Sequence, residues 1–289
     1  MKVLVTGATG FIGNYVINEL LAQNVEVIAT STSREKAKKK EWYSQVKYVE
    51  YSITSENNNL NEVFLQADAV IHLAWRGLPN YKSLFHIEEE MMIQYFFIKK
   101  LIDSGIKNIN ITGTCFEYGM QEGCLDEAKN IANPDNPYSI AKDTLRKMLD
   151  QFNKHLPFSL KWMRLFYTHG KGQYEKSILP LLQTALNEKQ SIFNMSGGEQ
   201  IRDYLPVEEM AKYIVAVSLQ TYTSGIINIS SNKPIKIIDL VNTYLMQSNK
   251  TISLNLGHYP YADYEPFAFW GNNNKLIQII NKYESNRTV

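Results

Sequence analysis

The sequence has few features that would connect it to disulfide chemistry, a nucleic acid or a membrane surface. Among its 289 residues only Cys115 and Cys124 are cysteines, which excludes a disulfide framework and a repeated metal-ligand spacing. The net charge is +1, and the longest basic run is Lys38–Lys40. A nearly neutral chain of this kind gives no electrostatic reason to expect a nucleic acid or an anionic membrane as partner.

Long apolar runs are also missing. No stretch approaches the roughly 18 apolar residues that a membrane-spanning helix needs, and the opening MKVLVTGATG reaches glycine too early for a signal peptide. We therefore expect a soluble, cytoplasmic protein. With 44% hydrophobic and 20% charged residues, the composition is that of a globular chain with one large domain or two lobes.

The first half of the chain alternates two hydrophobic periods. Short apolar runs predict buried strands, and the segments between them, such as Asn14–Gln23 and Met91–Ile102, have helical spacing. Apolar strands alternating with helices indicate a parallel sheet covered on both faces, the doubly wound Rossmann architecture of the α/β class. The predicted strands are Lys2–Thr6, Val25–Thr30, Val46–Tyr51, Ala69–Ala74, Ile106–Thr112 and Ser159–Phe166.

This alternation ends after Phe166, where THGKGQYEKS begins a polar loop and the later sequence becomes rich in Tyr, Asn and Pro. We predict a dinucleotide-binding domain over residues 1–167, with a return to the sheet over about 206–240 that includes GIINISS. Residues 168–289 are expected to form mostly a smaller, mixed α/β lobe that binds the substrate.

A glycine loop follows the first predicted strand directly. VLVTGATGFIG places Gly7, Gly10 and Gly13 between an apolar strand and a helix that begins near Phe11. Gly7 permits a tight turn, Gly10 lets the backbone approach a pyrophosphate, and Gly13 lets helix and strand pack closely. The helix N-terminus then offers N–H groups to the phosphates, so the loop predicts a dinucleotide site.

One tyrosine–lysine pair has the context of a catalytic pair. The pattern Tyr-x-x-x-Lys begins at Tyr43, Tyr95, Tyr138 and Tyr167. Only the third opens a helix, because Asn136 is a good N-cap and Pro137 suits the first helical position. Tyr138 and Lys142 then share one helix face at the carboxyl edge of the sheet. We expect the ammonium of Lys142, helped by a cationic nicotinamide, to lower the pKa of Tyr138 from about 10, so that Tyr138 can transfer protons.

The end of the second strand predicts the type of nicotinamide cofactor. An acidic residue at this place binds the ribose hydroxyls of NAD, but here the strand runs into ATSTSREKAKKK without Asp or Glu. The hydroxyl of Ser31 and the guanidinium of Arg34 suit a dianionic 2′-phosphate instead. This pattern predicts NADP(H) in preference to NAD(H).

Together these motifs resemble the extended short-chain dehydrogenase/reductases, in the epimerase/dehydratase branch that acts on nucleotide sugars. Thr6–Gly13 matches the fingerprint TGxxGxxG. Within GTCFEYG, the residues from Thr114 to Gly119 match the pattern (S/T)xxxYG. WMRLFYTHGKGQ and IRDYLPVEEMA are similar to two later family segments. The resemblance implies that Thr114 orients a substrate carbonyl or alcohol beside Tyr138, and that Thr114, Tyr138 and Lys142 are the catalytic residues.

The resemblance also implies contacts with cofactor and substrate. Ser52 stands where relatives often have Asp, Gln94 where they often have Asn, and Arg202 where an Arg meets the nucleotide diphosphate; the alternative for Arg202 is a structural pair with Asp203. The implied cofactor residues are Gly7, Thr9, Gly10, Phe11, Ile12, Gly13, Ser31, Arg34, Ser52, Ile53, Leu73, Ala74, Gln94, Tyr138 and Lys142. The implied substrate residues are Thr114, Cys115, Phe116, Tyr167, Ser177 and Arg202.

The two residues after Thr114 discriminate among the reactions of the family. Sugar 4,6-dehydratases need an Asp-Glu pair there, and combined epimerase-reductases need a Cys at the second position, but this chain has Cys115 and Phe116. The motifs look most like bacterial dTDP-4-dehydro-6-deoxyhexose reductases, which make sugars such as dTDP-fucose. We predict NADPH-dependent reduction of the C4 keto group of a nucleotide-linked, dTDP-type 4-dehydro-6-deoxyhexose. An NAD-dependent nucleotide-sugar 4-epimerase and a non-catalytic NADP(H) sensor are the alternatives.

Family dimers pack two helices from each subunit into a four-helix bundle. The segments near 91–103 and 137–154 are apolar enough to form a homodimer in this way, although burial in a monomeric core explains their apolarity as well.

Overall fold

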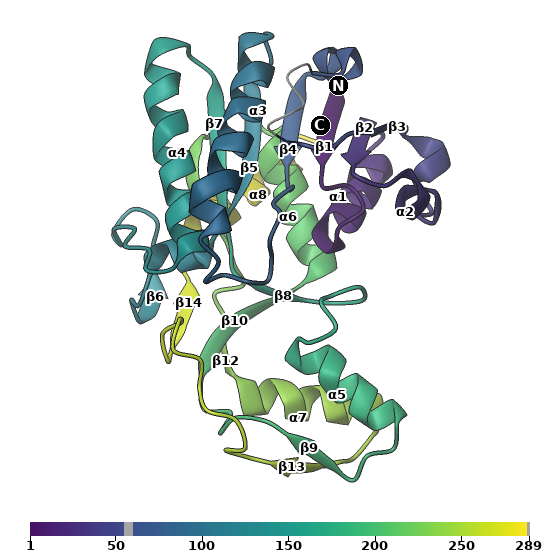
Figure 1. Ribbon diagram of the computed structural model, residues 1–289, viewed down its shortest axis with the longest axis vertical. Coiled ribbons are helices and arrows are strands. Elements are labelled where there is room, and N and C mark those ends of the chain that lie inside the picture. Colours follow the sequence, from purple (N-terminus) through teal and green to yellow (C-terminus); the bar gives the residue numbers. More distant parts are fainter. Residues whose placement is uncertain (55–59, 288–289) are drawn as a thin grey trace.

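A parallel sheet of seven strands forms the centre of the molecule (Figure 1). The computed structural model describes residues 1–54 and 60–287. The strands lie in the order β11-β7-β5-β4-β1-β2-β3, and every neighbouring pair is parallel. The strand order reverses between β1 and β4, as in a doubly wound sheet. The strands are β1 Lys2–Thr6, β2 Glu26–Ser31, β3 Lys47–Glu50, β4 Ala69–His72, β5 Asn108–Thr114, β7 Ser159–Leu165 and β11 Gly225–Ile229.

These strands confirm the predicted Rossmann architecture. Each of the six predicted strands is present, and GIINISS returns to the sheet as β11, beside β7. The bounds differ by a few residues. The predicted strand Ala69–Ala74, for example, ends at His72, and its last two residues turn toward the glycine loop.

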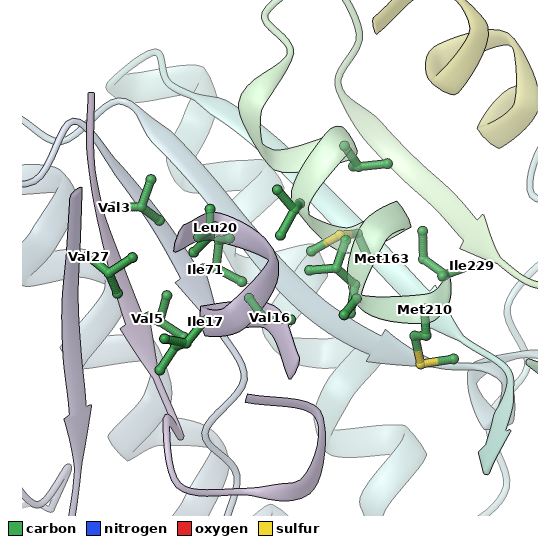
Figure 2. Packing of buried hydrophobic residues seen from close by; sticks show 14 of the residues in the cluster. Val3, Val5, Val16, Ile17, Leu20, Val27, Ile71, Met163, Met210 and Ile229 are labelled. Carbon is green, nitrogen blue, oxygen red and sulfur yellow. The ribbon is translucent and has the colours of Figure 1, made fainter. Parts of the chain in front are cut away.

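Helices cover both faces of the sheet. One hydrophobic core packs α1, α6 and α8 against the sheet, and Figure 2 shows Val16, Ile17 and Leu20 of α1 facing Val3, Val5 and other strand residues. A second core packs α3 and α4 against the opposite face. No helix among the described residues is both long and apolar enough to span a membrane. The helices are α1 Phe11–Ala22, α2 Arg34–Lys38, α3 Met91–Asp103, α4 Pro137–His155, α5 Ile178–Asn187, α6 Val207–Leu219, α7 Ile237–Ser248 and α8 Asn274–Ser285.

A smaller lobe, made here of α5, α7 and the short strands β9, β12 and β13, lies beyond the carboxyl edge of the sheet (Figure 1). A separate apolar cluster joins Leu182 and Ala185 of α5 with Ile237 and Val241 of α7. Strand β10 links this lobe to the sheet region, because it pairs parallel with β8 and antiparallel with β12. The remaining strands are β6 Gly123–Leu125, β8 Tyr167–His169, β9 Ile192–Asn194, β10 Ile201–Pro206, β12 Pro234–Lys236, β13 Ser253–Asn255 and β14 Phe269–Gly271.

The last helix, α8, lies in a different part of the molecule from the one predicted for the end of the chain. Residues 168–289 were expected to lie mostly in the smaller lobe, yet α8 packs against α6 and β11 of the Rossmann domain. Leu276 and Ile279 of α8 are buried in the core that also contains α1. The apolar spacing of this helix gave no indication of which partner buries it.

Close packing at the start of α1 leaves no space for a side chain at Gly13. A Cβ added at Gly13 would lie 2.3 Å from the carbonyl oxygen of Gly7, so Gly13→Ala must displace the loop. We expect this variant to lose about 1–3 kcal/mol of unfolding free energy, as overpacked sites do. Asn18→Ala, an exposed change on the same helix, should cost less than about 0.5 kcal/mol. Equal urea midpoints for the two variants would contradict the predicted steric conflict.

Candidate active site

The glycine loop has the geometry that a dinucleotide requires. Gly7 has a φ of +68°, and a Cβ there would lie 3.0 Å from the Ala74 nitrogen. Gly10 is the N-cap of α1, no side chain caps this terminus, and the first turn, which contains Phe11 and Ile12, has no acidic residue. A helix N-terminus with these properties favours an anion. Gly7, Thr9, Gly10, Phe11, Ile12 and Gly13 therefore fit the pyrophosphate of a nicotinamide dinucleotide.

A buried threonine ties this loop to the end of β4. Thr6 Oγ1 accepts hydrogen bonds from the backbone nitrogens of Leu73 and Ala74, both at 3.2 Å, and lies 2.9 Å from His72 Nδ1. Burial lowers the pKa of His72 to about 3, so this ring is neutral. The predicted cofactor residues Leu73 and Ala74 thus lie directly against the glycine loop.

Several other predicted cofactor residues already have protein partners. Ser31 Oγ lies 2.9 Å from the Tyr48 hydroxyl, and Arg34 contacts Glu50. Gln94 is buried on α3 and donates to the Glu90 carboxylate over 2.6 Å. Ser52 and Ile53 follow β3, and Ile53 lines a cavity of about 500 Å³ beside α3.

The three predicted catalytic residues are brought together at the carboxyl edge of the sheet. Thr114 is the last residue of β5, and Tyr138 lies in the first turn of α4. Asn136 caps α4, since its side chain accepts from Ser139 N over 3.0 Å. The Thr114 side chain lies close enough to Tyr138 to act on the pKa of its phenol. Parallel strands end at one edge, which explains why residues so far apart in sequence meet here.

Lys142 is held beneath this pair in a nearly dry environment. Its side chain donates to the Thr112 carbonyl over 2.9 Å, and its Nζ lies 3.9 Å from the centroid of the Trp75 ring. Only 2% of Lys142 is exposed. Burial lowers the pKa of Lys142 to about 7, although the carboxylates of Glu117 and Glu90 act in the opposite direction.

Tyr138 differs from the sequence prediction in its protonation. We expected Lys142 to lower its pKa, but burial raises the pKa of Tyr138 more than the neighbouring Thr114 side chain lowers it. The Lys142 ammonium is directed toward Thr112 and Trp75. The side chain of Lys142 alone therefore does not produce the expected lowering, and Tyr138 is a neutral phenol near pH 7.

Aromatic rings surround the Tyr138 side chain. Tyr81, Trp75 and His86 lie with ring centroids 5.5, 6.0 and 5.4 Å from that of Tyr138. Tyr81 also lies 5.9 Å from Tyr264, a residue of the aromatic C-terminal segment. The segment after β4 and the C-terminal segment therefore meet beside the candidate catalytic tyrosine.

Some of the predicted substrate residues lie beside Thr114, and another, Ser177, lies in the smaller lobe. Cys115 and Phe116 are buried next to Thr114, and Phe116 packs edge-on against Tyr81 and Tyr167. Burial raises the pKa of the Cys115 thiol, which keeps it protonated. Ser177 is the N-cap of α5 in the smaller lobe.

Arg202 is buried and already ion-paired. Its Nη2 lies 3.1 Å from Glu265 Oε1, and its Nη1 donates to the carbonyls of Ile201 and Phe267. Tyr167 donates to the same Glu265 carboxylate. The sequence alternative of a pair with Asp203 is wrong, because Asp203 accepts from Ser231 and from backbone nitrogens.

Glu117 is the principal residue that sequence reasoning missed. It is fully buried and accepts from Thr114 N at 2.9 Å, Trp162 Nε1 at 2.9 Å and Arg164 Nε at 2.7 Å. It stands within GTCFEYG, so a charged residue in an otherwise apolar segment was the available signal. Trp75 stands in HLAWRG directly after the strand end, and its large ring was likewise visible there.

The family model described as "NAD dependent epimerase/dehydratase family" matches residues 3–230. The chain is similar to the dTDP-6-deoxy-L-talose 4-dehydrogenase (NAD(+)) of Aggregatibacter actinomycetemcomitans, with 30% identity over 94% of this chain and 99% of the relative. It is also similar to the dTDP-4-dehydro-6-deoxyglucose reductase of Escherichia coli, with 22% identity over 86% and 82% of the two chains.

Among solved structures, the chain is similar to UDP-glucuronic acid 4-epimerase from Bacillus cereus in complex with UDP-glucuronic acid and NAD. The TM-score is 0.82 at 22% identity, covering 97% of this chain and 93% of that one, a likeness that concerns the fold. The matched family model spans the glycine loop, Thr114, Tyr138 and Lys142. This chain therefore belongs to the NAD-dependent epimerase/dehydratase family, whose members act on nucleotide sugars.

Proposed function

We propose that this protein reduces the C4 keto group of a dTDP-linked 4-dehydro-6-deoxyhexose, using a nicotinamide cofactor. One observation carries the proposal. Thr114, Tyr138 and Lys142 are assembled at the sheet edge, while the two positions that sugar dehydratases use for elimination hold a buried, protonated cysteine and a phenylalanine. The site can therefore exchange a hydride and a proton but has no acid–base pair with which to eliminate water.

The three side chains divide the work of the reductive step. A bound nicotinamide cofactor supplies the hydride. Tyr138 is protonated near neutral pH and donates its phenolic proton to the C4 oxygen. Thr114 orients the same oxygen through its hydroxyl. Lys142, whose Nζ is held by Thr112 and Trp75, is the residue that would hydrogen-bond the cofactor ribose.

The aromatic surroundings support a deoxysugar as substrate. Tyr81, Phe116 and Tyr264 present rings to one another within 5.1 to 6.2 Å, beside Tyr138. Such rings favour an apolar group, and the C6 methyl of a 6-deoxyhexose is one. The names of the talose and glucose relatives both specify dTDP-6-deoxyhexoses with chemistry at C4, which supports dTDP as the nucleotide.

The diphosphate of the substrate has a candidate ligand in Arg202. Its guanidinium is the buried cation that the resemblance assigns to this role, and Glu265 occupies it in the structure. We infer that the diphosphate competes with the Glu265 carboxylate for this guanidinium.

The cofactor type is the least supported part of the sequence prediction. Ser31 and Arg34 predict NADP(H), whereas the name of the talose relative specifies NAD(+) and the solved 4-epimerase holds NAD. The choice between NAD(H) and NADP(H) also depends on Arg34, whose side chain is paired with the Glu50 carboxylate.

A second candidate function is a nucleotide-sugar 4-epimerase. The fold of the Bacillus cereus 4-epimerase is shared over nearly the whole chain. An epimerase oxidises and re-reduces C4, so it needs the same Thr–Tyr–Lys arrangement. It differs in turning over without added cofactor.

We also infer that the protein forms a homodimer through α3 and α4. These helices pack side by side, and Phe96 on α3 and Ile140 on α4 are 51% and 36% exposed. Sedimentation equilibrium tests this inference, and a monomer at micromolar concentration would contradict it.

The proposed reaction is tested by mixing the pure protein with dTDP-4-dehydro-6-deoxyglucose and either NADH or NADPH. Oxidation of the reduced nicotinamide, with one 6-deoxyhexose formed per cofactor consumed, is the expected result. Interconversion of dTDP- or UDP-hexoses without added cofactor would favour the epimerase instead.

Tyr138→Phe should lower kcat by about 10²–10⁴-fold, because this variant lacks the proton donor. Binding of the dinucleotide should change less than about threefold, since the ring is retained. Tyr95→Phe alters the tyrosine of another Tyr-x-x-x-Lys segment, on α3, and is the matched control with expected wild-type activity. Full activity of Tyr138→Phe in steady-state kinetics would remove the proposed mechanism.

Lys142→Met should abolish activity and yet stabilise the fold at low pH. Burial lowers the pKa of Lys142 from 10.5 in the unfolded chain to about 7 in the folded protein. Burying the charged side chain therefore reduces the free energy of unfolding by its full amount below about pH 7. This loss shrinks as pH rises and disappears above about pH 10.5, where the lysine is neutral in both states. Methionine has no charge to bury. The urea midpoint of Lys142→Met should therefore exceed that of the wild type at pH 6.5, and the difference should shrink as pH rises toward 10.

Lys99→Met serves as the control for this stability comparison, because Lys99 is partly exposed and paired with Asp103. It should show no comparable change between pH 6.5 and 9. A Lys142→Met variant less stable than the wild type at pH 6.5 would contradict the predicted cost of the buried charge.

A further inference from the structure

The acidic residue missing from the end of β2 has a counterpart on the neighbouring strand. Ser31, the last residue of β2, is the register partner of Glu50, the last residue of β3. Both strands are parallel and end at the same edge, so Glu50 lies beside the place where a Rossmann fold binds the adenosine ribose. The sequence argument considered only the end of β2 and for that reason did not weigh this carboxylate.

Glu50 contacts the backbone and side-chain nitrogens of Arg34 that face it. Its Oε1 accepts from the Arg34 backbone nitrogen over 3.1 Å, and its Oε2 lies 3.7 Å from Arg34 Nε. A dianionic 2′-phosphate that used these two nitrogens would have to displace the carboxylate. It would then remain within a few ångströms of an anion of the same sign, an unfavourable arrangement even when solvent screens part of it.

The other polar groups at this edge are also engaged with β3. The hydroxyls of Ser31 and Tyr48 lie 2.9 Å apart, and the Tyr48 hydroxyl also donates to the Ser31 carbonyl over 3.1 Å. The Arg34 guanidinium lies over the Tyr48 ring, 5.4 Å from its centroid. Ser31 and Arg34, the two groups expected to bind a 2′-phosphate, are thus held by Tyr48 and Glu50.

We propose that Glu50 is the residue that selects the cofactor, and that it selects NAD(H) over NADP(H) by neutralising Arg34 and accepting hydrogen bonds from the ribose hydroxyls. An acidic residue contributed by β3 takes the role that the second strand usually fills. The inference rests on the proposed function only in requiring a nicotinamide dinucleotide at this edge. It is independent of the sugar and of the direction of the reaction.

Isothermal titration of NAD⁺ and of NADP⁺ into the full-length protein, without any sugar, tests the proposal. The wild type should bind NAD⁺ at least about tenfold more tightly than NADP⁺. Glu50→Gln keeps the size of the side chain and removes its charge. It should tighten NADP⁺ binding by about tenfold and change NAD⁺ binding by less than about threefold.

Two further variants identify the groups responsible. Glu35→Gln removes an exposed carboxylate from the residue next to Arg34 and should leave the ratio of the two dissociation constants unchanged. Arg34→Ala, added to Glu50→Gln, should abolish the gain in NADP⁺ affinity, because the guanidinium that Glu50 released is then absent.

A wild type that binds NADP⁺ more tightly than NAD⁺, or a Glu50→Gln variant with an unchanged ratio, would overturn the proposal. Binding of neither dinucleotide would overturn it as well, together with the cofactor assignment. Correct cofactor selection without turnover of a dTDP-hexose would leave this proposal standing and contradict only the proposed reaction. The two hypotheses can therefore fail separately.

Discussion

The buried carboxylate of Glu117 is the interaction on which the candidate site depends most. It lies at 0% exposure and joins the end of β5 to β7, accepting from the Thr114 backbone, from Trp162 and from Arg164. Removing one partner of a buried ion pair costs about 3–5 kcal/mol, because the other charge stays unpaired. Glu117 also acts electrostatically on Lys142. One side chain thus holds the backbone of Thr114 and favours the charged form of Lys142.

The parallel sheet then determines which residues can cooperate. Every strand of the large sheet ends at the same edge, so the glycine loop after β1, Ala74 after β4 and Thr114 at the end of β5 are neighbours. Helix α4 begins at this edge and contributes Tyr138 and Lys142 from its first turns. Burial opposes the charge on both side chains, since it raises the pKa of Tyr138 and lowers that of Lys142. At this edge the Tyr138 phenol is therefore held in its neutral form.

Features determined by short stretches of sequence could be predicted, and those determined by distant pairs could not. The strands, the glycine loop and the capped start of α4 follow from local patterns, and the structure has them in the expected places. Trp75 lies over Lys142, 67 residues away in sequence, and Glu265 pairs with Arg202 across 63 residues. No spacing rule connects such pairs. The contact between Arg34 and Glu50 shows the same limit, because it joins the start of α2 to the end of β3.

The central claim is that a hydride is delivered to C4 of a dTDP-linked 4-dehydro-6-deoxyhexose at this site. The most direct test supplies reduced nicotinamide cofactor carrying deuterium at its transferable position and follows the sugar by NMR. The account predicts one deuterium bound to C4 of the product and none at C3 or C5, with no such label from Tyr138→Phe. Label at another carbon, or a product that acquires no deuterium, would contradict it.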